Sequence, residues 1–226
     1  MFEAGKKTQS GYLAVPSSGS GPGVLVLPAW WGLNEFFVGL CDRLAQEGFV
    51  ALAPDWYGGA IARTVPEAKE LQGTLDFAST QSNVVEALKA LRQHPATQGS
   101  KVGAVGFSMG AAWALQLSAH LPEDITAVVV FYGLDTADFK AARAAYLCHF
   151  AEKDEWEPLE QVPLMEADMR AAGRETTFYT YPGVEHWFFE SDRPNEFNAE
   201  AAQLAWERTL VFLRDQLSPT KVSKTD

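Results

Sequence analysis

Gly106-Phe107-Ser108-Met109-Gly110 is the stretch that decides the fold of this chain. It follows an apolar, β-branched run at residues 101–106 and opens a helical pattern that runs from Ser108 to about His120. The pattern G-x-S-x-G between a buried strand and a helix is typical of a nucleophile elbow, a tight turn that exposes a serine hydroxyl. Glycine two residues to either side lets strand and helix approach closely. The alternative is an ordinary strand-to-helix turn in which Ser108 serves as the N-cap.

Outward from this turn, short apolar runs alternate with stretches of helical period, which is typical of an α/β fold. We predict seven strands, at residues 11–15, 24–28, 49–54, 101–106, 125–131, 145–150 and 176–181. Helices are expected around residues 37–44 and 84–91 and over 108–120, 157–172 and 195–217. Residues 24–27 and 128–131 are continuously apolar, as parallel strands buried on both faces are. The prediction is a mostly parallel sheet of about seven strands flanked by helices.

Composition favours one domain over residues 1–217, followed by a flexible tail at 218–226. The 226 residues are 47% apolar and carry a net charge of −11, which disfavours nucleic acid and membrane surfaces as partners. No signal peptide or membrane span is expected. Cys41 and Cys148 lie in apolar stretches without metal-ligand spacing, so we expect buried, reduced thiols, a cytoplasmic protein, and neither metal nor cofactor.

A serine nucleophile needs a base that takes its proton and an acid that orients this base. In this kind of fold the chain order is Ser, acid, His. Of the four histidines, His186 follows the last predicted strand in a turn-forming segment and is our candidate base. Asp154, just after the strand at 145–150, is the preferred acid, and Asp135 is the alternative one strand earlier.

An oxyanion hole and a pocket should lie at the same edge of the sheet. The backbone N–H of Met109 and that of Trp30 are the expected oxyanion donors, with Ala29 as the neighbouring alternative to Trp30. Residues 58–82 are the only stretch that could form a partial lid. The expected pocket residues are Trp31, Phe36, Trp56, Tyr57 and Trp187.

Several segments match a known pattern in order. They are Trp31-Gly32-Leu33-Asn34, Ala53-Pro54-Asp55-Trp56-Tyr57, the stretch at residues 105–110, Phe131-Tyr132-Gly133, residues 149–154 and residues 181–186. In these the chain resembles the dienelactone hydrolases (carboxymethylenebutenolidases) of the α/β-hydrolase superfamily over residues 11–217. The resemblance implies an α/β-hydrolase fold without a large cap domain and makes Ser108, Asp154 and His186 the catalytic triad.

The chain departs from that family at two places. Serine replaces the cysteine nucleophile and Ala29 replaces a glutamate beside it, which implies a conventional serine mechanism. Glu190 stands where the family has an arginine for the substrate carboxylate, although Arg63 or Arg193 could serve instead. We therefore expect hydrolysis of small, neutral esters or lactones by a monomer or homodimer. The alternatives are a thioesterase or acyltransferase with the same triad, and a non-catalytic binding protein on this fold.

Overall fold

A sheet with strand order β1-β3-β2-β4-β5-β6-β7 forms the centre of the computed structural model, which describes residues 3–7 and 10–218. Only β1 is antiparallel to its neighbour, and all the other pairs are parallel. The strands are β1 Gly11–Ala14, β2 Gly21–Leu27, β3 Val50–Pro54, β4 Thr97–Phe107, β5 Ile125–Phe131, β6 Ala145–Ala151 and β7 Thr176–Tyr181. The predicted fold class is confirmed.

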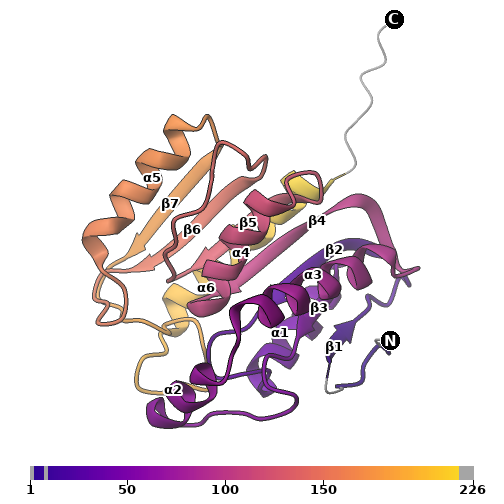
Figure 1. The fold of residues 1–226 in the computed structure, drawn as a ribbon, viewed down its shortest axis with the longest axis horizontal. Helices are drawn as coiled ribbons and strands as arrows, with labels where there is room; N and C mark the ends of the chain where they lie inside the picture. The colour runs from indigo at the N-terminus through magenta and orange to yellow at the C-terminus, as the bar shows by residue number, and fades with distance from the viewer. Residues whose placement is uncertain (1–2, 8–9, 219–226) are drawn as a thin grey trace, which may run out of the picture.

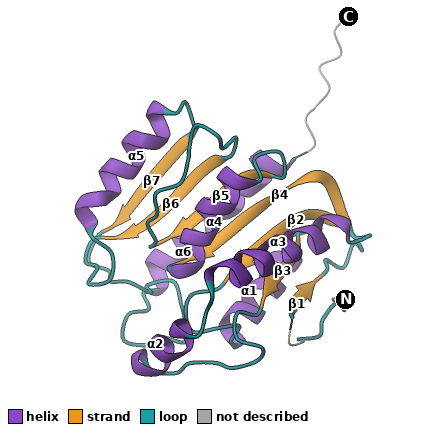
Figure 2. Cartoon of the chain, viewed as in Figure 1, coloured by secondary structure: helices purple, strands orange, loops and turns teal. Residues whose placement is uncertain are grey.

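Helices cover both faces of this sheet (Figures 1 and 2). They are α1 Glu35–Gln46, α2 Val65–Gly73, α3 Phe77–Gln93, α4 Met109–His120, the short 3-10 helix η1 Leu159–Gln161, α5 Val162–Ala171 and α6 Ala199–Leu217. The apolar sides of α1 and α6 pack against one face, and those of α3, α4 and α5 against the other. Each face therefore has its own hydrophobic core.

Alternation along the central strands divides their side chains between the two cores. On β2, Val24 and Val26 belong to the core under α1 and α6, whereas Leu25 and Leu27 belong to the core under α3, α4 and α5. All four side chains are fully buried. Burial on both faces explains why the strand reads as a continuous apolar run.

The helix boundaries differ from the predicted ones where proline or a capping residue intervenes. The helix expected over 157–172 is split into η1 and α5, with Pro158 immediately before η1. The helix expected from residue 195 begins instead at Ala199, because the Asn198 side chain accepts a hydrogen bond from the Ala201 N–H. β2 begins at Gly21 and β4 at Thr97, earlier than the predicted starts at residues 24 and 101.

Helix α2 was not predicted, although its sequence holds a start signal. Thr64 and Glu67 form a capping box, in which each side chain accepts a hydrogen bond from the other residue's backbone N–H. A weak apolar period hides the helix, because Ala68 is its only buried residue. The helix lies within the stretch expected to be a partial lid.

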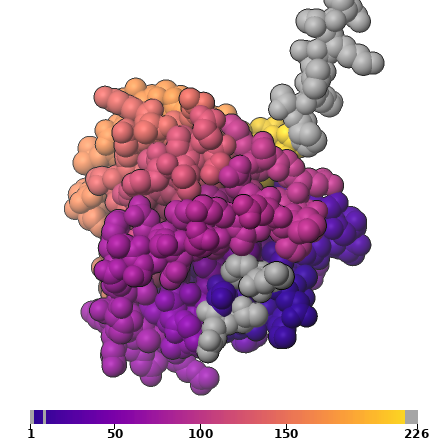
Figure 3. Space-filling view, turned by 45° about the vertical axis from the view of Figure 1, so that its right-hand side comes forward, coloured from indigo at the N-terminus to yellow at the C-terminus, as the bar shows by residue number. Residues whose placement is uncertain are grey.

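The parallel strands all end at one edge of the sheet, where their arrowheads point in Figure 1. Helix α2 and the yellow loop that leads from β7 to α6 lie at this edge. In the face shown in Figure 3, the described residues form one body without a separate lobe. The described residues contain no separate cap domain. This carboxyl edge is where ligands of open α/β sheets bind.

Three further expectations can be compared with the structure. Cys41 and Cys148 are buried free thiols, and burial raises the pKa of each. Within the described part of the chain, no helix is long and apolar enough to span a membrane. Residues 219–226 of the predicted tail lie outside the described residues.

Candidate active site

The turn between β4 and α4 has a strained backbone. Ser108 has φ +50° and ψ −116°, which is rare for a residue with a side chain. A Cβ on Gly106 would lie 2.6 Å from the Ala111 Cα, and a Cβ on Gly110 would lie 2.6 Å from the Pro28 carbonyl oxygen. Glycine is therefore required on both sides of Ser108. The Ser108 side chain does not cap α4, so the ordinary capped turn is excluded.

Ser108, His186 and Asp154 form one hydrogen-bonded series. The Asp154 Oδ2 lies 2.7 Å from the His186 Nδ1, and the His186 Nε2 lies 3.0 Å from the Ser108 Oγ. An ionised carboxylate can only accept, so the His186 Nδ1–H donates to Asp154 and the Nε2 accepts from the Ser108 hydroxyl. The side chains of Asp154 and His186 are 0% and 3% exposed. These are the three residues that the sequence singled out.

The loop after β6 holds Asp154 in place. Its Oδ1 accepts hydrogen bonds from the backbone N–H groups of Trp156 at 2.9 Å and Glu157 at 3.0 Å. The alternative acid, Asp135, instead accepts a hydrogen bond from the neighbouring Thr136 N–H at 2.6 Å, and this hydrogen bond is exposed to solvent. The structure thus brings Asp154, and not Asp135, to His186.

Three hydrogen bonds tie the loop of Asp154 to the loop of His186. The Glu152 N–H donates to the Tyr181 carbonyl, and the Lys153 N–H donates to the Val184 carbonyl. The Gly183 N–H donates to the Glu152 carboxylate at 2.7 Å. No local sequence pattern reveals this last bond, because Glu152 and Gly183 lie 31 residues apart.

The loop after β2 is fixed through its carbonyl groups. The carbonyls of Pro28, Ala29, Trp30 and Trp31 each accept a hydrogen bond. Met109, the first residue of α4, has no intrahelical acceptor for its N–H. Since Gly110 packs against the end of β2, the Met109 N–H lies at the helix N-terminus beside this fixed loop.

Four indole rings form a cluster next to His186, which we call the tryptophan cluster: Trp30, Trp31, Trp156 and Trp187. Neighbouring ring centroids lie 5.1 to 6.4 Å apart. Trp156 is 40% exposed, whereas the other three are at most 9% exposed. Trp156 is therefore the member of the cluster that a ligand can reach directly.

The other predicted pocket residues lie deeper than expected. Trp56 is buried in the core under α3 and donates from its Nε1 to the Pro28 carbonyl at 3.0 Å. Tyr57 donates to the Trp30 carbonyl at 3.1 Å, so it supports the loop after β2. Phe36 packs edge-to-face on Phe107. Their aromatic character serves packing, which the sequence does not distinguish from pocket lining.

Glu190 does not face an open pocket as a charge. Its side chain is 0% exposed, and burial raises its pKa to about 8, so it is mainly neutral at pH 7. It accepts a hydrogen bond from the Tyr132 hydroxyl at 2.9 Å. Burial disfavours the charged form of Glu190, so a preference for neutral substrates does not depend on a charge at this residue.

Arg63 and Arg193 line a small pocket beside the tryptophan cluster. The pocket has a volume of about 310 Å³ and includes Trp31 and Trp187. The Arg193 guanidinium lies 3.7 Å from the Trp31 ring centroid and 3.4 Å from the Asp192 carboxylate. The positive charge of Arg193 is thus already in contact with the Trp31 ring and the Asp192 carboxylate.

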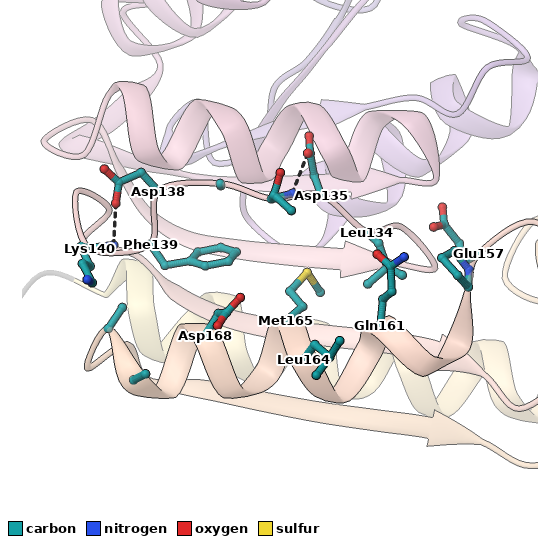
Figure 4. A pocket seen from close by; sticks show the side chains of 15 residues that line it. Leu134, Asp135, Asp138, Phe139, Lys140, Glu157, Gln161, Leu164, Met165 and Asp168 are labelled. Atoms are coloured by element: carbon teal, nitrogen blue, oxygen red, sulfur yellow. Dashed lines mark hydrogen bonds between the residues drawn. The ribbon is translucent and has the colours of Figure 1, made fainter.

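A larger cavity, of about 820 Å³, lies between the loop after β5 and α5 (Figure 4). Ser108 is not among its lining residues. Glu157 lies at one end of the cavity, and burial together with Asp154 raises its pKa to about 8. The cavity therefore adjoins the Asp154 loop without opening onto the serine.

The remaining histidines make structural hydrogen bonds. His149 is fully buried between the Tyr181 hydroxyl at 2.9 Å and the Thr209 hydroxyl at 3.2 Å, and burial lowers its pKa to about 3. His94 and His120 bond to backbone groups near their own helix ends. Across residues 3–7 and 10–218, no three Asp, Glu, His or Cys side chains are grouped so that they could hold a metal ion.

Three comparisons with known proteins find relatives with related names. The model of the "Dienelactone hydrolase family" matches residues 10–217. A putative carboxymethylenebutenolidase of Aquifex aeolicus is 32% identical, over 96% of this chain and 97% of its own. A Bradyrhizobium protein named probable 2-oxo-3-(5-oxofuran-2-ylidene)propanoate lactonase is 32% identical, over 90% and 88%. The crystal structure of a putative dienelactone hydrolase from Klebsiella pneumoniae is similar with a TM-score of 0.80 and 26% identity, over 90% and 91%.

Proposed function

Because this chain belongs to the dienelactone hydrolase family, whose members hydrolyse ester bonds, we propose that it is a serine hydrolase that cleaves small carboxylic esters or lactones. Ser108 is the nucleophile, His186 the general base and acid, and Asp154 the group that orients His186. The observation that carries the proposal is the pair of distances, 2.7 Å and 3.0 Å, that join Asp154, His186 and Ser108.

In the first half of the reaction, the Ser108 Oγ attacks the carbonyl carbon while its proton passes to the His186 Nε2. The imidazolium then donates this proton to the leaving alkoxide, and the acyl group stays on Ser108. In the second half, His186 takes a proton from water, the hydroxide attacks the acyl carbon, and the proton returns to the Ser108 Oγ as the acid leaves. Asp154, held by two backbone N–H groups, keeps the His186 Nδ1–H directed toward itself throughout.

Negative charge develops on the carbonyl oxygen in both halves. The N–H groups of Met109 and Trp30 are the proposed oxyanion donors. The Met109 N–H lies at the positive end of α4, and the loop of Trp30 is held by hydrogen bonds to four of its carbonyls. A donor on a fixed loop needs no reorganisation during the reaction, which is what oxyanion stabilisation requires.

Small, neutral substrates fit this site best. Without a cap domain, the acyl and alcohol groups meet the exposed ring of Trp156, which offers apolar contact. Arg193 is already paired with Asp192 and Trp31, and the net charge of −11 disfavours the approach of anions. A lactone belongs in the substrate panel because the Bradyrhizobium relative is named a probable lactonase.

The test is a panel of short-chain p-nitrophenyl esters, lactones and thioesters, together with labelling by a fluorophosphonate. The unaltered protein is compared with Ser108→Ala and with Ser79→Ala, a control on the exposed side of α3. We expect one label per chain, located on Ser108, and ester hydrolysis that falls by about 10⁶ in Ser108→Ala only.

Each other outcome revises a specific part of the proposal. Activity retained in Ser108→Ala would show that Ser108 is not the nucleophile. Preference for thioesters, or acyl transfer to an added alcohol, would indicate a thioesterase or acyltransferase. No labelling and no turnover would leave a non-catalytic binding protein.

A further inference from the structure

A tyrosine packs directly on the His186 ring. The ring centroids of Tyr132 and His186 lie 4.7 Å apart, with an angle of 54° between the rings. Tyr132 follows the last residue of β5 and is fully buried. Its backbone has φ +38°, which is uncommon for an aromatic residue, and its N–H donates to the His149 carbonyl at 2.8 Å. This bent backbone directs the Tyr132 ring toward the base.

The same tyrosine reaches the His186 loop at a second point. Its hydroxyl donates to the Glu190 Oε1 at 2.9 Å, and Glu190 lies four residues after His186. The Glu190 N–H in turn donates to the Trp187 carbonyl at 2.9 Å, which keeps this part of the loop tightly turned. Tyr132 therefore contacts the loop both at the imidazole and at the carboxyl group of Glu190.

Neither residue has the geometry of an acid or a base in the reaction. Both nitrogens of His186 are already engaged, by Asp154 and by Ser108. The Tyr132 hydroxyl is occupied by Glu190, and burial holds its pKa well above the ordinary value. What the two residues can do is restrict how the imidazole moves.

Resting on the function proposed above, we propose that Tyr132 and Glu190 are positioning residues that hold the His186 imidazole in line between Asp154 and Ser108. The Tyr132 ring limits rotation of the imidazole, and the hydrogen bond to Glu190 fixes the Tyr132 ring. The Glu190 Oε2 has no hydrogen-bond partner among the described residues. The bond from the Tyr132 hydroxyl to Oε1 is therefore the one hydrogen bond of the Glu190 side chain within that part of the chain.

The charges around Glu190 are consistent with a neutral, hydrogen-bonding role. Asp192, Arg193 and Glu196 face it from its own segment, and Tyr132 faces it from the end of β5. Burial and Asp192 raise the Glu190 pKa, while Tyr132 and Arg193 act in the opposite direction. A glutamine at this position keeps both the size and the accepting oxygen of the protonated acid.

The test is a set of four variants assayed on the preferred p-nitrophenyl ester. Tyr132→Phe and Glu190→Met each remove the hydrogen bond, and we expect each to lower kcat by about 10-fold to 100-fold with KM nearly unchanged, since misplacing a catalytic group costs this much. Glu190→Gln keeps the acceptor, and we expect kcat within about threefold of the unaltered protein. The double variant Tyr132→Phe/Glu190→Met should be no slower than the slower single variant, because both changes remove one interaction.

Tyr146→Phe is the matched control. Tyr146 is as buried as Tyr132, and its hydroxyl lies 2.8 Å from the Ser118 hydroxyl, away from His186. We expect Tyr146→Phe to lower the thermal midpoint as Tyr132→Phe does, with kcat unchanged. Complete but slower fluorophosphonate labelling of Tyr132→Phe would show an intact, misaligned site, whereas failure of the unaltered protein to label would instead refute the proposed function.

Three results would overturn the proposal. One is an unaltered kcat in Tyr132→Phe. Another is a Glu190→Gln variant as slow as Glu190→Met, which would make the carboxyl group itself essential. The third is an equal loss of kcat in Tyr146→Phe, which would attribute the effect to general loss of stability.

Discussion

The stability of Glu190→Gln relative to the unaltered protein should rise as the pH rises from about 5.5 to about 8. In the unfolded chain the Glu190 carboxyl loses its proton near pH 4.5, whereas burial raises its pKa in the folded protein to about 8. Between these two values the folded state binds the proton and the unfolded state does not. Raising the pH therefore favours unfolding of the unaltered protein. Glutamine does not titrate, so Glu190→Gln removes this contribution to the pH dependence of the free energy of unfolding.

The magnitude follows from the two pKa values. Each pH unit between them changes the free energy of unfolding by about 1.4 kcal/mol, so the gain from Glu190→Gln should grow by about 3 kcal/mol over this range. Glu190 is 0% exposed, so solvent screens little of this effect. Glutamine still accepts the Tyr132 hydroxyl, whereas its amide N–H groups lie on the Oε2 side, where the described residues offer no partner. The unpaired amide costs about 1 to 3 kcal/mol at every pH, so it offsets the gain without changing its pH dependence.

Urea unfolding, followed by the fluorescence of the seven tryptophans, measures this difference at several pH values. His149 and Glu157 also have shifted pKa values. Their contributions to the free energy of unfolding cancel in the difference between the two proteins, because both proteins contain them. Glu200→Gln, at an exposed position of α6, is the control for the same substitution away from Tyr132, and its difference is measured at the same pH values. A Glu190→Gln difference that stays constant within about 0.5 kcal/mol would show that Glu190 titrates normally in the fold, and would refute the reasoning.

Three further predictions follow from the site and the helix at its edge. Asp154→Asn should lower kcat by about 10⁴, because it offers His186 the wrong hydrogen-bonding partner, whereas Asp135→Asn should stay near the unaltered rate; an exchange of these severities would move the acid to the earlier strand. A neutral ester should be hydrolysed faster than its carboxylate-bearing analogue with the same leaving group; the reverse order, abolished by Arg193→Ala, would indicate a carboxylate site. Thr64→Ala should destabilise α2 locally by about 1 kcal/mol, seen as faster hydrogen exchange at residues 65–73 with global unfolding nearly unchanged; equal exchange in both proteins would argue against the capping box.

The elbow could be predicted because its sequence pattern is local. Gly106 and Gly110 lie two residues to either side of Ser108, and the strand and helix around them have strong periods, although the contact that requires Gly110 comes from the end of β2. The strand positions follow from the same local patterns, since β2 and β5 are buried on both faces. His186 and Asp154 could be chosen because parallel strands end at one edge and the chain order is restricted.

The rest could not be predicted because it depends on contacts between distant segments. Nothing near Glu190 in the sequence indicates that it is buried, since its partner Tyr132 lies 58 residues earlier. Glu152 and Gly183 are likewise joined only by the fold. Trp56 and Trp156 read alike as aromatic loop residues, yet one is 6% exposed and the other 40%.

Backbone strain in the described residues is concentrated around His186. Apart from glycine, only Ser108, Tyr132 and Trp187 among residues 3–7 and 10–218 have positive φ, from +38° to +67°. Left-handed backbone costs about 1 to 2 kcal/mol for each such residue, and glycine would relieve it. Glycine would also remove the Ser108 hydroxyl, the Tyr132 ring on the imidazole, and the Trp187 indole next to His186. These three positions therefore trade backbone stability for side chains that contact one imidazole, and this trade is expected where a site must hold its base in one orientation.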